Sequence, residues 1–148
     1  MNEVEKQIVQ MAINILESQL KTAGDALTSP SEVKNFLRLN LELLEYEVFA
    51  VLFLDVKNRV IEYRQMFTGT IDGASVHPRE VVKAALAANA ASVIFAHNHP
   101  SGMTEPSRAD KQLTTRLKAA LELVDIRTLD HIIIGKREQT SFAEIGLL

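Results

Sequence analysis

The sequence predicts a single α/β domain of the α+β type, in which a mixed β-sheet is flanked by helices. Its 148 residues match the commonest size of a domain with one hydrophobic core. Segments with helical periodicity and short apolar runs follow one another in the order α, α, β, β, α, β, α, β. In one of these runs the residues at both odd and even positions are apolar, which is typical of a strand that is buried on both faces of a sheet.

The first predicted helix covers residues 4–23, where apolar side chains recur at helical spacing, and Gly24 follows where a helix stop is expected. This segment divides the chain into an N-terminal amphipathic helix and linker, residues 1–28, and a compact domain, residues 29–148. The apolar stripe of the helix is favoured as core. A surface for a partner or for a second copy of the chain is the alternative.

The second helix begins at the stretch SPSE. Ser29 is the expected N-cap, Pro30 occupies the first helical position, and Glu32 completes a capping box. The apolar stripe that follows indicates a helix as far as about residue 44.

Two strands come next. The string VFAVLFLD, residues 48–55, is the run that is apolar at both alternations and predicts a central strand. A turn around Lys57 and Asn58 leads to a second strand near residues 60–67, which is the expected hairpin partner.

The remaining elements alternate. Pro78 opens a helix, and the apolar string SVIFAH, residues 92–97, is a buried strand. Another helix begins at Ser107, and HIIIG, residues 131–135, is a further short strand. The stretch TSFAEIGLL, residues 140–148, closes the chain.

Two histidines stand at the end of the strand in the sequence AHNHPSG. Side chains alternate along a strand, so His97 and His99 lie on the same face and can bind one ion. Further on, Ser107 and Asp110 have the spacing of a capping box, at a helix end where a carboxylate is favoured. Each pattern alone has an ordinary structural reading: loop histidines bonded to backbone, and a plain helix cap. Together they place Asp110 as a third ligand, if the intervening loop folds back.

The chain has no cysteine, so a metal site must use histidine and carboxylate. Two histidines and one carboxylate leave the fourth position of a tetrahedral zinc open for water, the pattern of a catalytic site. A general base is then needed. Glu42, Glu45 and Glu47 are the candidates near a strand, and Glu47 is favoured because it stands where the central strand begins.

Several motifs together resemble the bacterial RadC family, within the JAB/MPN (JAMM) metalloprotease-like superfamily. They are E-x-F at 47–49, PRE at 78–80, AHNHPSG, PS-x-x-D at 106–110, DHIIIG and the ending SFAE-x-G-L-L. The resemblance implies the JAB/MPN, cytidine-deaminase-like architecture. It implies one Zn²⁺ per chain and hydrolysis of a peptide or isopeptide amide. By the same resemblance the zinc ligands are His97, His99 and Asp110, Glu47 is the general acid/base, and Ser107 steadies the water or the oxyanion.

Other functional classes are disfavoured. The net charge is −3, without the basic stripe that nucleic-acid binding uses, and no apolar run approaches the roughly 18 residues of a membrane span. Longer RadC proteins carry an N-terminal helix-hairpin-helix region, for which the first 30 residues are too short. The absence of cysteine fits a cytoplasmic protein. Two alternatives stay open: a catalytically silent zinc-containing binding module, and a protein associated with DNA repair or recombination.

His131, which follows Asp130 at a strand start, is expected either to support a metal ligand or to play a structural role. The substrate and the oligomeric state are not predicted.

Overall fold

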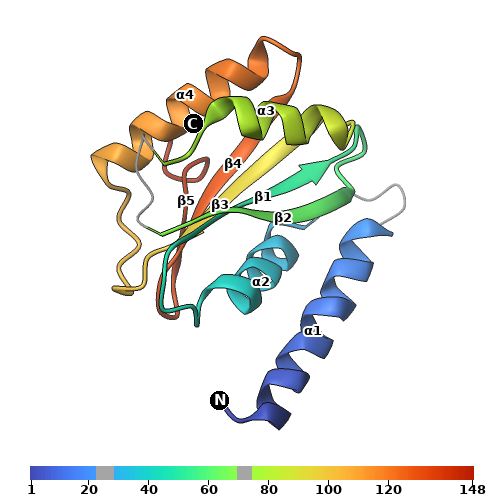
Figure 1. Ribbon diagram of the computed structural model, residues 1–148, viewed down its shortest axis with the longest axis vertical. Helices are drawn as coiled ribbons and strands as arrows, with labels where there is room; N and C mark the ends of the chain where they lie inside the picture. The colour runs from blue at the N-terminus through green and yellow to red at the C-terminus, as the bar shows by residue number, and fades with distance from the viewer. Residues whose placement is uncertain (23–28, 70–74) are drawn as a thin grey trace.

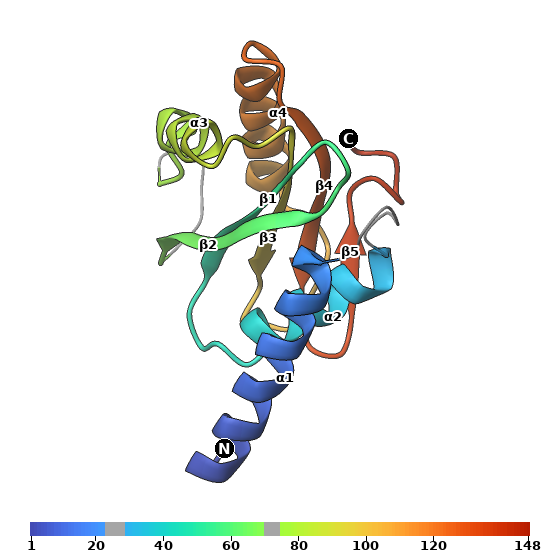
Figure 2. The ribbon, with the colours of Figure 1, turned by 90° about the vertical axis from the view of Figure 1, so that its right-hand side faces the viewer.

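The computed structural model describes residues 1–22, 29–69 and 75–148, and in it a mixed sheet lies between two layers of helices (Figures 1 and 2). The predicted fold class is therefore confirmed. In chain order the elements are α1 (Glu3–Lys21), α2 (Pro30–Leu41), β1 (Val48–Leu54), β2 (Val60–Thr68), α3 (Pro78–Ala87), β3 (Ser92–Asn98), α4 (Arg108–Glu122), β4 (Arg127–Ile134) and β5 (Gln139–Ser141).

The five strands run in the order β2-β1-β3-β4-β5. β1 pairs antiparallel with β2, which confirms the predicted hairpin, and on its other side it pairs antiparallel with β3. β3 and β4 are parallel and are joined by the crossover helix α4, whereas β5 returns antiparallel to β4. Because β1 and β3 are antiparallel, the carboxyl end of β3 and the start of β1 lie side by side at the same end of the sheet.

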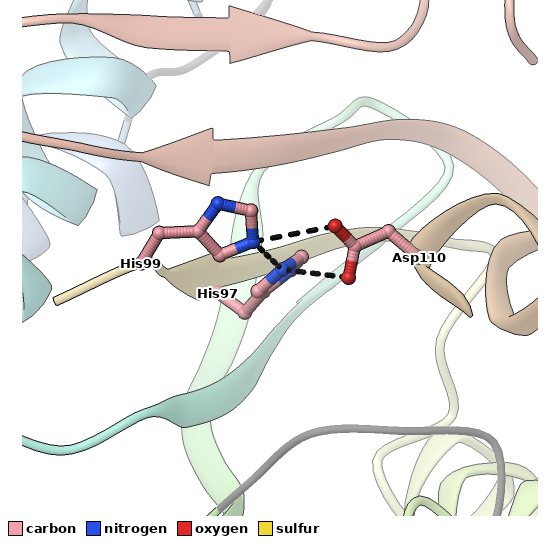
Figure 3. Close-up of side chains that lie close together, drawn as sticks. All are labelled: His97, His99 and Asp110. Atoms are coloured by element: carbon pink, nitrogen blue, oxygen red, sulfur yellow. Dashed lines mark hydrogen bonds and ion pairs between the residues drawn. The ribbon is translucent and has the colours of Figure 1, made fainter. Parts of the chain in front are cut away.

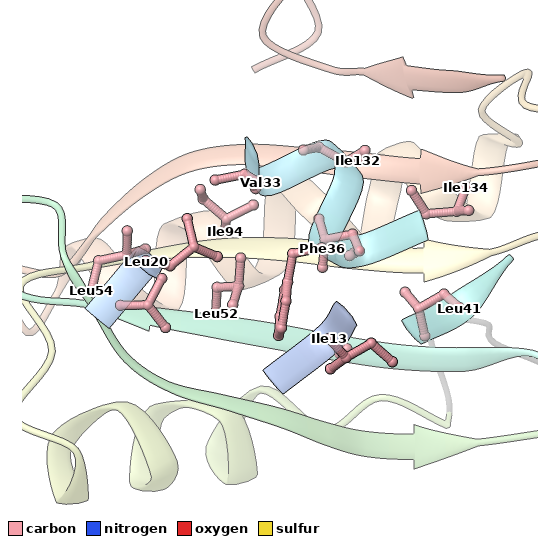
Figure 4. Packing of buried hydrophobic residues seen from close by; sticks show 14 of the residues in the cluster. Ile13, Leu20, Val33, Phe36, Leu41, Leu52, Leu54, Ile94, Ile132 and Ile134 are labelled. Carbon is pink, nitrogen blue, oxygen red and sulfur yellow. The ribbon is translucent and has the colours of Figure 1, made fainter. Parts of the chain in front are cut away.

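Every residue of β1 and β3 is buried, as predicted for strands covered on both faces. Alternate residues of β1 enter two separate cores. On one face they pack beneath α1 and α2 (Figure 4); on the other they pack beneath α3 and α4. Phe49, Phe53 and Phe95 belong to this second core, and it continues directly into the histidines at the end of β3.

Some predicted boundaries are wrong. α2 ends at Leu41, three residues before the predicted end, and the chain turns there toward β1. β4 begins at Arg127 rather than His131, because the polar residues before the apolar run also pair with β3. β5 is an additional strand; its short polar sequence QTS carries no clear strand signal. Ala23 and Gly24, the predicted end of the first helix, lie outside the described residues.

The helix caps agree with the sequence-based predictions more closely than the element boundaries do. The Ser29 hydroxyl accepts a hydrogen bond from the Glu32 N–H at 3.5 Å, one half of the expected capping box. At α4 both halves form: Ser107 Oγ accepts from the Asp110 N–H, and the Asp110 carboxylate accepts from the Ser107 N–H. Asp110 is thereby held in a defined orientation at the start of its helix.

α1 carries two apolar stripes rather than one. One stripe packs into the core through Ile13 and Leu20, and of the apolar residues on which the prediction rested it includes only Leu16 and Leu20. The other faces solvent, with side chains between 58% and 64% exposed: Val4, Ile8, Met11 and Ile15. Figure 1 shows the N-terminal half of α1 extending beyond the sheet and α2. The core interpretation is therefore wrong for these four residues, which formed most of the predicted apolar stripe.

Candidate metal centre

The end of β3 and the start of α4 bring three predicted ligands together (Figure 3). His97 lies near the end of β3, His99 directly follows that strand, and Asp110 occupies the first turn of α4. The Nε2 atoms of His97 and His99 are 2.9 Å apart. They lie 3.1 and 3.2 Å from the two carboxylate oxygens of Asp110.

The loop between His99 and Ser107 folds back as this geometry requires. Gly102 has a φ of +91°, a left-handed conformation that favours glycine, and its N–H donates to the His99 carbonyl at 2.9 Å. The Gly102 carbonyl accepts from the Lys136 N–H at 3.1 Å. A Cβ atom at this glycine would stand 2.7 Å from the Lys136 side chain. Conformation and space therefore both require glycine in the HPSG turn.

The donor set fits a divalent cation. His99 Nδ1 lies 2.9 Å from the Met103 carbonyl, which can only accept, so in a neutral His99 ring the Nε2 atom carries the lone pair. That lone pair faces His97 and the Asp110 carboxylate. Electron-rich atoms this close repel one another unless a positive charge lies between them. Imidazole nitrogens and a carboxylate oxygen are the ligands that zinc uses in proteins, so zinc suits this position.

Protons can supply that positive charge when no metal is bound. The hydrogen bond to Asp110 raises the pKa of His99, outweighing its partial burial. Burial opposes ionisation of Asp110, but hydrogen bonds from His97, from His99 and from the Ser107 N–H hold its pKa well below the usual range. The carboxylate is therefore ready to bind a cation, and His99 must release its proton when a metal takes its place.

This linkage predicts opposite pH dependences for the two forms of the protein. In the zinc-free form, the stability contributed by protonated His99 is fully present below about pH 6.5 and is lost as pH rises through the raised folded-state pKa. Zinc affinity increases over the same range, because the ligand must be neutral. Chemical unfolding and zinc titration at several pH values measure both trends. In a His99→Gln variant the first trend should vanish, and its persistence would show that another group is responsible.

The three candidate bases have different surroundings. Glu42 pairs with Arg38 at 3.2 Å and accepts from the Arg137 N–H, and Glu45 is exposed. Glu47 is half-buried immediately before β1. The pairing of β1 with β3 ends at Phe49 and His97, so Glu47 comes two residues before the last pair, at the end of β3 that carries the histidines. The charge of Glu47 also contributes to the raised pKa of His99.

Asn98, between the two histidines, is a buried residue whose role the sequence did not reveal. Its Oδ1 accepts from the Val48 N–H at 2.8 Å, and its Nδ2 donates to the Tyr46 carbonyl at 2.9 Å. The amide therefore holds the backbone on both sides of Glu47. The only sequence signal was a polar residue at the end of an otherwise apolar strand.

An Asn98→Asp variant should lose about 1–3 kcal/mol of unfolding free energy, because a carboxylate at this buried position cannot donate to the Tyr46 carbonyl and turns an oxygen toward it instead. Urea unfolding of the zinc-free protein measures the loss. The same substitution at exposed Asn35 of α2 is the matched control and should change stability by less than about 0.5 kcal/mol. Equal losses of stability at the two positions would contradict the role given to the hydrogen bonds of the Asn98 amide.

Ser107, the predicted catalytic hydroxyl, is exposed and is hydrogen-bonded to Asp110 of the cluster. Its oxygen accepts from the Asp110 N–H at 3.0 Å, so its own hydrogen can be donated elsewhere. His131, whose role was left open, contacts His97 directly: its Nε2 lies 2.8 Å from His97 Nδ1.

Fold and site together define a class: a three-layer α/β domain with a His-His-Asp cluster, able to hold a metal ion, where a central strand meets a helix N-terminus. The family model described as RadC-like JAB domain matches residues 27–147. The chain therefore belongs to the RadC family, as its motifs predicted.

Relatives of two lengths support this assignment. A UPF0758 protein of Nitrosococcus oceani is 59% identical over 140 residues, which are 95% of this chain and 62% of that protein. UPF0758 proteins of Vibrio cholerae and Escherichia coli K12 (YkfG) are 55% and 53% identical, over 90% and 94% of their own lengths. The chain thus spans about 62% of the longer relatives. None of the helices in the described ranges has the length and hydropathy of a membrane-spanning segment.

Proposed function

We propose that this chain is a zinc-dependent, metallopeptidase-like hydrolase that cleaves a peptide or isopeptide amide, with one zinc ion per chain. The observation that carries the proposal is the convergence of His97, His99 and Asp110 around one point. These three residues would hold a zinc ion, which would supply a bound water of lowered pKa and a Lewis acid for the substrate carbonyl. Solvent reaches the cluster at His99, whose side chain is 16% exposed, whereas that of His97 is 1% exposed.

The protein's own residues supply the remaining functions. The half-buried Glu47 carboxylate, whose charge acts on His99, takes a proton from the attacking water and returns it to the leaving nitrogen. Ser107 donates its hydroxyl hydrogen to the oxyanion that develops on the carbonyl oxygen. Asn98 holds the backbone on either side of Glu47, so the base stays aligned during the reaction.

We also propose a peptide or protein substrate and a cytoplasmic location. The net charge of −3 disfavours nucleic acid as a partner. The chain spans only part of the longer relatives. What is said here of activity, substrates and partners is therefore proposed for the whole protein as well.

The test is a panel of peptides and isopeptide-linked substrates, incubated with zinc-loaded protein, with protein treated with a chelator, and with treated protein after zinc is restored. The proposal expects cleavage that the chelator abolishes and zinc restores. Zinc binding without cleavage of any substrate would instead support a binding module. Cleavage that survives removal of the metal would contradict a metal-dependent reaction.

A further inference from the structure

A buried chain of hydrogen bonds lies behind the metal centre. His97 Nδ1 is 2.8 Å from Nε2 of His131 on β4, and His131 Nδ1 contacts the hydroxyl of Thr114 on α4. That hydroxyl lies 2.8 Å from the backbone carbonyl of Asp110, one helical turn earlier. His97, His131 and Thr114 are all at least 97% buried, so water does not compete for these bonds. The chain links two of the three candidate ligands from the side opposite to the metal.

The direction of each bond follows from elementary chemistry. The Asp110 carbonyl can only accept, so the single hydroxyl hydrogen of Thr114 points to it. The Thr114 oxygen must therefore accept from His131, whose Nδ1 carries a hydrogen. A neutral His131 then presents the lone pair of its Nε2 to His97. His97 in turn carries its hydrogen on Nδ1 and keeps the Nε2 lone pair for the metal.

The surroundings of His131 favour the neutral ring on which this assignment depends. Its ring stacks on Phe142 at a centroid distance of 4.6 Å and forms T-shaped pairs with Phe49 and Phe95 at centroid distances of 5.8 and 5.9 Å. Its two ring nitrogens face Thr114 and His97, neither of which is a carboxylate. A charged imidazolium in this aromatic enclosure would lack a counter-ion in contact, which is costly in a protein interior.

We propose that Thr114 and His131 are positioning residues that set the tautomer and the ring orientation of His97, so that its Nε2 lone pair is directed at the metal. This inference rests on the metal site of the proposed function. It predicts that the hydroxyl of Thr114, about which the sequence alone says nothing, controls zinc affinity although it touches neither the metal nor the substrate.

Two substitutions at Thr114 separate positioning from packing. Thr114→Val keeps the shape but removes the hydroxyl, so His131 Nδ1 loses its acceptor and the ring can change tautomer. Zinc affinity should then fall about 10- to 100-fold, the usual effect of losing a bond that supports a metal ligand. Thr114→Ser keeps the hydroxyl and should retain affinity within about threefold. A purely structural role predicts the reverse order, because valine fills the same volume and serine leaves a gap.

Thr115→Val is the matched control. Thr115 is the next residue of the same helix and also bonds the carbonyl four residues back, that of Lys111, but it is exposed. Zinc affinity of this variant should equal that of the unmodified protein. Competition with a chromophoric chelator measures all three dissociation constants, and thermal unfolding of the zinc-free variants shows that each is folded.

Long-range ¹H–¹⁵N NMR spectra of the histidines, recorded on the zinc-loaded protein, read the tautomers directly. The expected result is a proton on Nδ1 of both His131 and His97. A proton on Nε2 of either ring, or unchanged zinc affinity in Thr114→Val, would overturn the inference and leave the proposed hydrolysis standing. Conversely, the expected tautomers without any hydrolysis would refute the proposed function alone.

Discussion

A Glu47→Gln variant should bind one zinc ion per chain and turn over substrate about 10²- to 10⁴-fold more slowly than the unmodified protein, the usual contribution of a general base. Glutamine keeps the size and polarity of the side chain but cannot take a proton from water. The variant keeps all three candidate zinc ligands, because Glu47 is outside the cluster of His97, His99 and Asp110. Metal analysis and steady-state kinetics on one sample measure both quantities.

Glu45→Gln is the matched control for this prediction. Glu45 lies two residues earlier and is exposed, so its loss should leave both zinc content and turnover unchanged. If Glu47→Gln retained full activity, the base would have to be sought elsewhere. If it lost zinc as completely as a His97→Ala variant, Glu47 would be a ligand rather than a base.

The second large effect is expected at Asp110. An Asp110→Asn variant should lose high-affinity zinc binding, because a neutral amide replaces a buried carboxylate whose pKa is held far below its usual range. The unmodified protein should gain about 2.7 kcal/mol of unfolding free energy from zinc at 100 times its dissociation constant. The variant should gain none. Chemical unfolding with and without added zinc measures the difference.

The helix cap provides the control for Asp110. Asparagine can still accept from the Ser107 N–H, so the start of α4 is preserved in the variant. Ser107→Ala does the opposite: it breaks the bond to the Asp110 N–H, at a cost of about 0.5–2 kcal/mol, and keeps the carboxylate. Ser107→Ala should therefore bind zinc normally. Zinc stabilisation that persisted in Asp110→Asn would show that the ion binds elsewhere.

Local patterns predicted the parts of the fold that depend on nearby residues. The run of β1 that is apolar on both faces and the cap at Ser107 each have a physical cause within a few positions. The end of α2 and the strand β5 depend instead on where distant chain segments pair, which single-sequence periodicity does not report. The division of the chain at residue 28 stays a prediction.

The candidate site shows the same distinction. Spacing made His97, His99 and Asp110 candidate ligands, and the resemblance to the RadC family favoured them over the ordinary readings of a loop and a helix cap. The parts played by Asn98 and Thr114 were not predictable, since their partners lie 50 and 17 residues away in the sequence. One ordinary asparagine and one ordinary threonine acquire their roles only from the way that β1, β3, β4 and α4 meet.

The central claim is that these three side chains share one zinc ion, and the most direct measurement is a crystal structure of zinc-soaked protein recorded at the zinc absorption edge. The account predicts a single anomalous peak at about 2.0–2.2 Å from Nε2 of His97, Nε2 of His99 and one carboxylate oxygen of Asp110. Imidazoles turned away from that carboxylate, or no peak at the cluster after soaking, would contradict it.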